Sequence, residues 1–161
     1  MNQSNKKNLE FIKNSGVTYF LQDSPRNWFE DNRKSHKQHV ISGDNDKIVN
    51  INKVIDSIKN YQTPLQKSSK KLVVYDGTLN AKVMFIGEAP GKDEDEKGIP
   101  FVGRAGQLLN KMLKAINLNR EDVYITNVVN WRPPDNRTPT DEEILEFLPF
   151  LQRQIDIVDP K

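Results

Sequence analysis

Two short apolar runs with an amphipathic helix between them most constrain the fold of this chain. Residues 82–87 (KVMFIG) and 122–129 (DVYITNVV) have the continuous apolar character of strands buried on both faces of a parallel sheet. Residues 104–118 repeat apolar side chains at helical spacing. The apolar face of this helix is predicted to consist of Leu108, Leu109, Met112, Leu113 and Ile116. With a further short strand at 72–75 (LVVY), this order predicts a three-layer α/β fold with a parallel sheet.

The last predicted helix begins after residue 140. Thr140 and Glu143 have the spacing of a capping box, in which each side chain bonds the backbone of the other residue. The apolar face of this helix is predicted to consist of Ile144, Leu148, Leu151 and Ile155. Pro149 is expected to kink the helix, because proline lacks the backbone N–H that a helix interior needs.

Residues 1–62 are expected to form a helical, partly disordered N-terminal extension in front of an α/β domain at 63–161. Residues 5–15 and 47–60 have helical periodicity, whereas residues 30–46 are almost entirely polar and are typical of a linker. The helix at 47–60 is predicted to have Asp44 or Asp46 as its cap and an apolar face of Ile48, Ile51, Ile55 and Ile58.

The charged residues and the absence of cysteine exclude several classes of protein. The 161 residues include no Cys, which excludes disulfides, thiol catalysis and Cys-ligated metal sites. His36 and His39 are predicted to be solvated, because zinc sites need three or four ligands. No apolar run reaches the ~20 residues that span a bilayer, and the first ten residues lack the apolar segment of a secretion signal. A cytoplasmic protein without membrane association is therefore expected.

Positive charge is concentrated in the first half of the chain. Residues 1–80 carry 13 basic and 8 acidic side chains, whereas residues 81–161 carry 11 basic and 14 acidic ones. A basic front half is compatible with nucleic-acid binding. A solvated extension is the simpler interpretation, since most runs of charge are solvated surfaces.

Polar loops follow the two main predicted strands at their carboxyl ends, where open α/β sheets bind their ligands. Glu88 follows the first strand and Asn127 the second, so the two side chains are expected to share a pocket with Phe101. A carboxamide can read the edge of a base and a phenylalanine can stack on its face. The set suits a nucleobase, although Gly and Pro after a strand often form only a turn and Asn127 is as often a turn residue as a ligand contact.

Three segments of the chain resemble the family 4 uracil-DNA glycosylases. They are KVMFIGEAPGKDEDEKGIPFVGRAGQLLNKML, VYITNVVNWRPPDNRTPTDEEI and PFLQRQIDIVDPK, and the resemblance covers about residues 63–161. It implies the uracil-DNA glycosylase-like fold and a role in base excision repair, with uracil-containing DNA as the partner. The family flips uracil out of DNA and hydrolyses the N-glycosidic bond that joins it to the sugar.

The resemblance also implies roles for individual residues. Glu88 corresponds to a residue near the water and the sugar. Ala89 stands where more distant families have a water-activating Asp, and because Ala cannot activate water, Glu88 is left as the catalytic charge. Backbone groups of Gly87, Glu88 and Ala89 would bind the base, Phe101 would stack on uracil and Asn127 would read its edge. The candidates for contact with DNA are Pro90, Gly91, Arg104, Arg132 and Arg137.

One departure from the family concerns its iron–sulfur cluster, which four Cys residues bind. The corresponding positions fall at Trp131 and Phe147 and near Thr63 to Leu65, and none of them is Cys. The chain is therefore expected to have no iron–sulfur cluster and no other cofactor or metal. The large apolar side chains at Trp131 and Phe147 are expected to fill the space of the cluster.

A second departure concerns the part of the family that follows residue 161. That part carries a His-Pro-Ser loop whose His stabilises the departing uracil, and neither His36 nor His39 has this context. The chain is thus interpreted as a truncated glycosylase domain, with an open sheet edge, an exposed apolar helix face and weak or no activity alone. The alternative is a non-catalytic DNA-binding or interaction fragment. Such a fragment would be the remnant of a split or decayed gene, or a half completed by a second polypeptide.

Overall fold

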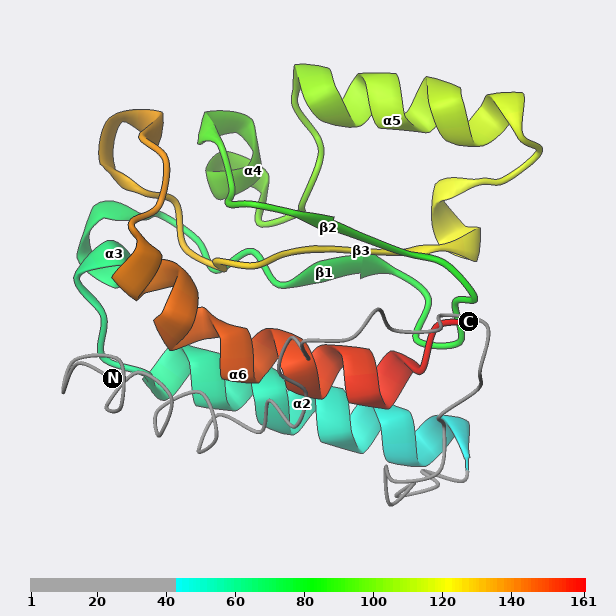
Figure 1. Ribbon diagram of the computed structural model, residues 1–161, viewed down its shortest axis with the longest axis horizontal. Helices are drawn as coiled ribbons and strands as arrows, with labels where there is room; N and C mark the ends of the chain where they lie inside the picture. The colour runs from blue at the N-terminus through cyan, green and yellow to red at the C-terminus, as the bar shows by residue number, and fades with distance from the viewer. Residues whose placement is uncertain (1–42) are drawn as a thin grey trace, which may run out of the picture. The chain divides into compact units, whose positions relative to one another are not determined.

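The computed structural model describes residues 43–161 (Figure 1). The helix expected at 5–15, nearly all of the expected linker, and His36 and His39 lie outside the described residues. The elements are α2 (Asp44–Asn60), α3 (Pro64–Ser68), β1 (Tyr75–Gly77), β2 (Met84–Gly87), α4 (Lys92–Lys97), α5 (Arg104–Ala115), η1 (Arg120–Asp122), β3 (Tyr124–Asn127), η2 (Pro134–Asn136) and α6 (Asp141–Val158). η1 and η2 are short 3₁₀ helices.

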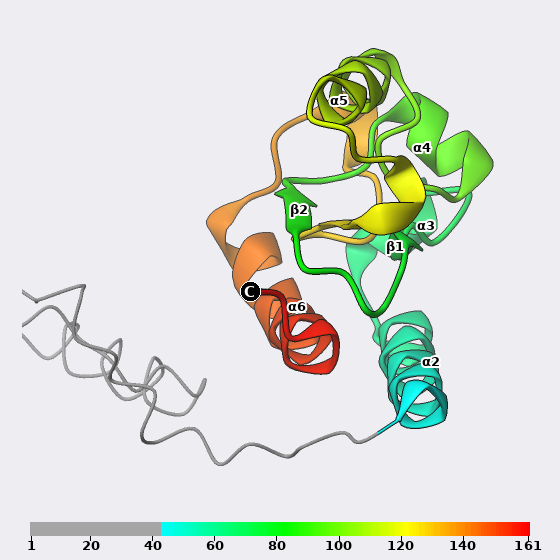
Figure 2. The same cartoon turned by 90° about the vertical axis from the view of Figure 1, so that its right-hand side faces the viewer.

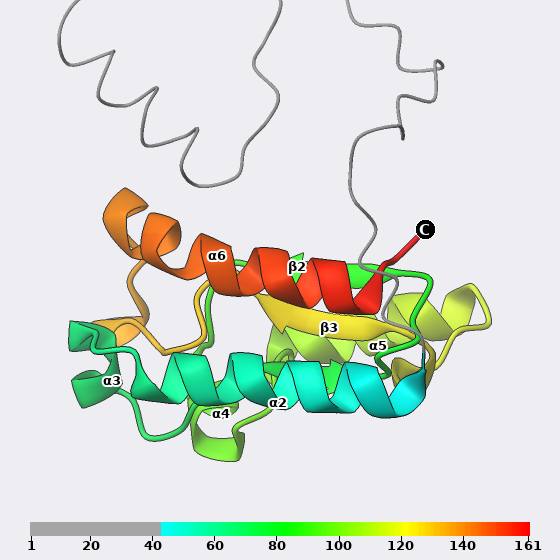
Figure 3. The same cartoon turned by 90° about the horizontal axis from the view of Figure 1, so that it is seen from below.

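The three strands lie between two layers of helices (Figures 1 and 2). Helices α2 and α6 run side by side in opposite directions under one face of the sheet, and Figure 3 shows the pair from below. Helices α4 and α5 cover the other face. The predicted three-layer α/β fold is therefore confirmed for the described residues.

The sheet is mixed, with the strand order β1-β3-β2. Strand β2 pairs with β3 in parallel as predicted, whereas β1 pairs with β3 antiparallel. The strand expected at 72–75 was placed too early, since β1 begins only at Tyr75. Side chains bond the two backbone carbonyls before it: Thr126 Oγ1 donates to the Val74 carbonyl at 2.6 Å, and Asn130 Nδ2 donates to the Val73 carbonyl at 3.1 Å.

Burial differs between the two parallel strands. The prediction that both are buried on both faces is correct for β3, which lies in the centre of the sheet and is buried at every residue. It is wrong for β2, the edge strand among the described residues, where Ile86 is 44% exposed. The neighbouring Val83 is 41% exposed.

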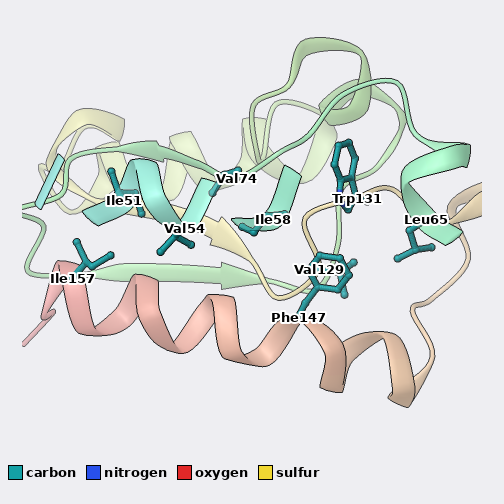
Figure 4. Close-up of a cluster of buried hydrophobic side chains, with 9 residues drawn as sticks. All are labelled: Ile51, Val54, Ile58, Leu65, Val74, Val129, Trp131, Phe147 and Ile157. Carbon is teal, nitrogen blue, oxygen red and sulfur yellow. The ribbon is translucent and has the colours of Figure 1, made fainter. Parts of the chain in front are cut away.

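The main core lies between the sheet and the α2–α6 pair (Figure 4). Its buried residues are Ile51, Val54, Ile58, Leu65, Val74, Val129, Trp131, Phe147 and Ile157. Helix α2 therefore packs into this core, although Ile48 of the predicted face is about half exposed and Val54 is buried instead. The N-cap of α2 is Gly43 and not Asp44 or Asp46, both of which lie in the first helical turn.

Helix α6 buries a face different from the predicted one. Phe147, Leu151, Gln154, Ile157 and Val158 are buried, and of these only Leu151 was predicted. Leu148 is exposed beside Pro149, and the helix continues through this proline. Because the proline lies on the solvent side, the loss of its hydrogen bond leaves no unsatisfied group in the core.

The layer formed by α4 and α5 differs from the prediction in two ways. In α5, Leu109 and Leu113 are buried, whereas the predicted core residues Leu108, Met112 and Ile116 are exposed along one row at i, i+4 and i+8. The residues expected to form one long loop before α5 include helix α4. Acidic residues in its first turn favour a helix, since they complement the positive end of its dipole, and Gly98 ends it with a φ of 79°.

The capping box of α6 is present as predicted. The Glu143 N–H donates to Thr140 Oγ1 at 3.2 Å, and the Thr140 N–H donates to Glu143 Oε2 at 2.9 Å. Arg137 donates to both carboxylate oxygens of Glu143, at 2.8 and 2.6 Å, and this hydrogen bonding holds the pKa of Glu143 below its usual range.

Replacement of Thr140 by Ala tests this cap. We expect Thr140→Ala to lower the free energy of unfolding by ~1 kcal/mol, because the Glu143 N–H loses its acceptor. Urea denaturation monitored by circular dichroism measures the change. The control is Ser57→Ala, which removes an exposed hydroxyl that bonds Lys53 within α2 and is expected to leave stability nearly unchanged. Equal stabilities for both variants would contradict a stabilising cap.

Candidate active site

A pocket of about 440 Å³ lies at the carboxyl ends of β2 and β3. It is lined by Gly87, Glu88, Ala89, Gly91, Lys92, Asp93, Glu94, Phe101, Gly103, Arg104, Ala105 and Asn127. The pocket brings together all five residues that the sequence predicted to bind a base. Parallel pairing explains this arrangement, since it places Gly87 directly opposite Asn127 in the register of the two strands.

Asn127 lines this pocket and carries a buried hydrogen-bond donor. The residue is only 2% exposed, and its Nδ2 atom has no hydrogen-bond partner within residues 43–161. An unsatisfied buried donor costs roughly 1–3 kcal/mol. A ligand that presents an acceptor to Asn127 would remove this cost.

Gly87 allows Asn127 and Phe101 to approach the end of β2 closely. A Cβ atom at position 87 would lie 2.4 Å from Asn127 Oδ1 and 2.7 Å from the Phe101 ring carbons Cε2 and Cζ. Real Cβ contacts are essentially never shorter than 3.0 Å. Only glycine therefore fits here without displacing one of the two side chains.

Glu88 lies on the exposed side of the pocket. Its backbone carbonyl accepts from the Val129 N–H at 3.0 Å, and the Gly87 carbonyl accepts from the Val128 N–H at 2.9 Å. These bonds continue beyond the strand ends and fix the backbone that carries the carboxylate. The arrangement leaves a negative charge where solvent and pocket meet.

Glu94 is a site residue that the sequence analysis did not select. Its Oε1 accepts from the backbone N–H groups of Val102 and Gly103 at 2.9 and 2.8 Å, and its Oε2 accepts from the Gly91 N–H at 3.1 Å. This carboxylate joins the start of α4 to the start of α5, which form two walls of the pocket. The available signal was its position three residues after Gly91, the N3 position of a helix.

The candidate DNA-contact residues fall into two groups. Gly91 and Arg104 line the pocket, and Lys92 beside them adds a second positive charge that the sequence analysis did not select. Pro90, Arg132 and Arg137 do not line it. Pro90 is buried. Arg132 donates to Asn136 at 2.7 Å and lies 3.8 Å from Asp95, while Arg137 is paired with Glu143.

The residues at the expected cluster positions do not fit a metal cluster. Leu65, Trp131 and Phe147 are members of the same buried apolar core, in which Figure 4 shows their side chains. Thr63 Oγ1 caps α3 by accepting from the Leu65 N–H at 3.4 Å. In residues 43–161, no group of three His, Cys, Asp or Glu side chains is arranged to hold a metal ion.

The sequence model of the uracil DNA glycosylase superfamily matches residues 74–161, which include both parallel strands and the whole pocket lining. The chain belongs to this superfamily.

Among its relatives, the chain is similar to the type-4 uracil-DNA glycosylase of Pyrobaculum aerophilum, with 48% identity over 114 residues, which are 70% of this chain and 58% of that protein. It is 50% identical to the type-4 enzyme of Thermotoga maritima over 97 residues, 60% of this chain and 50% of that protein. Identity to the type-4 enzyme of Archaeoglobus fulgidus is 52% over 96 residues, 60% of this chain and 48% of that protein. The chain thus spans about half the length of the curated relatives it matches.

Helices long and apolar enough to cross a membrane are absent from the described part of the chain.

Replacement of Gly87 tests the geometry of the pocket. We expect Gly87→Ala to displace the Asn127 amide or the Phe101 ring, because the new methyl group would overlap both. The shift should be visible in the side-chain NH₂ signals of Asn127 and the ring signals of Phe101 in NMR spectra. Ser57→Ala, which changes a residue of α2 outside the pocket, is the control and should leave both sets of signals unchanged. Unchanged Asn127 and Phe101 signals in Gly87→Ala would contradict the close contact.

Proposed function

We propose that this chain recognises uracil in DNA and hydrolyses its N-glycosidic bond in base excision repair. The observation that carries the proposal concerns Asn127, which lines the same pocket as Phe101 and whose Nδ2 has no hydrogen-bond partner among the described residues. A flipped uracil presents carbonyl oxygens that can accept from this amide, and its flat face can stack on the phenyl ring. The names of the similar type-4 glycosylases support the same activity.

In the proposed reaction, water adds to C1′ of the deoxyribose as the bond from C1′ to N1 of uracil breaks. The bonding electron pair leaves with the base, and a proton of the water goes to solvent or to the uracil anion. Positive charge that develops on the sugar is stabilised by a nearby carboxylate, which is the role we assign to Glu88. In this proposal backbone groups of Gly87 to Ala89 hold the base, and Lys92 and Arg104, which line the pocket, contact phosphates.

The proposal includes no iron–sulfur cluster. The chain has no Cys, and packing of Leu65, Trp131 and Phe147 supports an apolar substitute for the cluster at the corresponding positions. No step of the proposed reaction needs a redox group or a metal. A cytoplasmic location would give the protein access to DNA and remains part of the proposal.

An oligonucleotide assay tests the function and the residue roles. We expect the chain to bind single-stranded DNA with one uracil more tightly than the same strand with thymine, and to excise the uracil slowly. Asn127→Ala should abolish the discrimination, and Glu88→Gln should lower the excision rate by roughly 10²–10³-fold, the usual effect of removing an electrostatic catalytic group. Alkaline cleavage of the abasic product measures excision, and fluorescence anisotropy measures binding.

The matched controls are Asn52→Ala and Glu121→Gln, which change exposed residues outside the pocket. Both are expected to behave like the unchanged chain. Equal affinity for the uracil and thymine strands together with no excision would reject the proposal. Excision that neither Asn127→Ala nor Glu88→Gln alters would reject the residue roles.

In a second candidate function, this chain is one half of a glycosylase domain, and a second polypeptide supplies the other half. Among the described residues β2 is an edge strand, which favours this possibility because an unpaired strand edge can accept another strand. Ile86 of β2 and the preceding Val83 are 44% and 41% exposed. We expect a polypeptide that carries the remaining family strands and the His-Pro-Ser loop to raise the excision rate. A variant with Lys in place of Ile86 should weaken that effect, and a rate that the added polypeptide leaves unchanged would contradict the candidate.

A further inference from the structure

Arg120, in η1, contacts the backbone that carries Phe101. Its Nη1 donates to the Phe101 carbonyl at 3.0 Å, and its Nη2 donates to the Pro100 carbonyl. Nη1 also donates to Asn110 Oδ1 at 3.1 Å, and Nε donates to the carboxylate of Asp76. Arg120 thereby joins β1, the loop before α5 and α5 itself.

Phe101 has a backbone conformation that needs such support. Its φ is 53°, in the left-handed region that bulky residues rarely adopt. Gly106 allows the start of α5 to lie directly against it, since a Cβ atom at position 106 would be 1.7 Å from the Phe101 carbonyl oxygen. The strained conformation aims the phenyl ring at Gly87 and the pocket.

We infer that Arg120 is a positioning residue, which holds the Phe101 ring in the orientation that stacks on a base. A planar guanidinium can donate to two neighbouring carbonyls at once, and the carboxylate of Asp76 fixes its plane. Arg120 does not line the pocket, so it acts on a ligand only through Phe101. The effect of Arg120 on uracil recognition rests on the proposed function, whereas its effect on the position of the Phe101 ring does not.

The position of Phe101 is tested in the protein without DNA. We expect NMR spectra of the unchanged chain to show nuclear Overhauser effects between the Phe101 ring protons and the Gly87 Hα protons. A strong nuclear Overhauser effect between the amide proton and Hα of Phe101 should report the positive φ, because the two protons lie closest together in this conformation. Both signatures should be lost in Arg120→Gln and in Arg120→Lys, since an ammonium keeps the charge beside Asp76 but lacks the planar fork. Arg153→Gln, which removes an exposed arginine on α6, should retain both.

A double-mutant cycle tests the effect on uracil. Arg120→Lys is expected to lower the preference for a uracil strand over a thymine strand by about tenfold, the size of a lost base–aromatic stacking interaction. In a Phe101→Ala background, Arg120→Lys should have no further effect, because the two residues act as one unit. A purely structural role would lower the preference equally in both backgrounds.

The two measurements separate this inference from the proposed function. Phe101 signatures that persist in folded Arg120→Lys would overturn the inference even if the unchanged chain recognises uracil. Loss of the β3 amide signals in both Arg120 variants would also overturn it, because Arg120 would then support the whole fold. If the unchanged chain does not prefer uracil, the proposed function fails, and the NMR result alone decides the role of Arg120.

Discussion

The candidate site depends on the parallel pairing of β2 with β3, which sets Gly87 opposite Asn127. Because both strands end at the same edge, their loops meet there and enclose one pocket. A shift of one residue in this register would turn the Asn127 side chain to the other face of the sheet. In the observed register, Gly87 leaves room for the Asn127 carboxamide and the Phe101 ring. Strand register and residue size together therefore define the pocket.

The register is itself supported by a polar contact beneath β3. Buried Gln154 of α6 accepts through Oε1 from the hydroxyl of Tyr124, the first residue of β3, at 2.8 Å. Such a bond requires one alignment of strand and helix, whereas apolar contacts tolerate sliding. Burial raises the pKa of Tyr124 well above its ordinary value, so its hydroxyl stays protonated and remains a donor. The rigid base of the site therefore comes from the α6 side of the sheet.

The sequence predicts those features that local pattern controls. The apolar run at 122–129, the capping box at Thr140 and the polar residues after each strand each follow from neighbouring residues, and the structure contains all three. Burial on β2, α5 and α6 was predicted less well, because it depends on which elements lie across from each face. The role of Arg120 could not be predicted, since its partners lie ten to forty-four positions away in the chain.

Trp131 stands at one of the positions where the family has a cluster cysteine, and it lies close in the chain to Asn127 of the pocket. Three residues separate Asn127, the last residue of β3, from Trp131, so whatever anchors Trp131 also limits the motion of the loop that follows Asn127. A metal cluster would anchor such a loop by coordination. Here burial of Trp131 in the main core, which also contains Leu65 and Phe147, performs the anchoring, and burying one large apolar side chain contributes ~1.5–3 kcal/mol. The apolar core therefore maintains the geometry of the site, and loss of the cluster ligands does not by itself imply loss of the pocket.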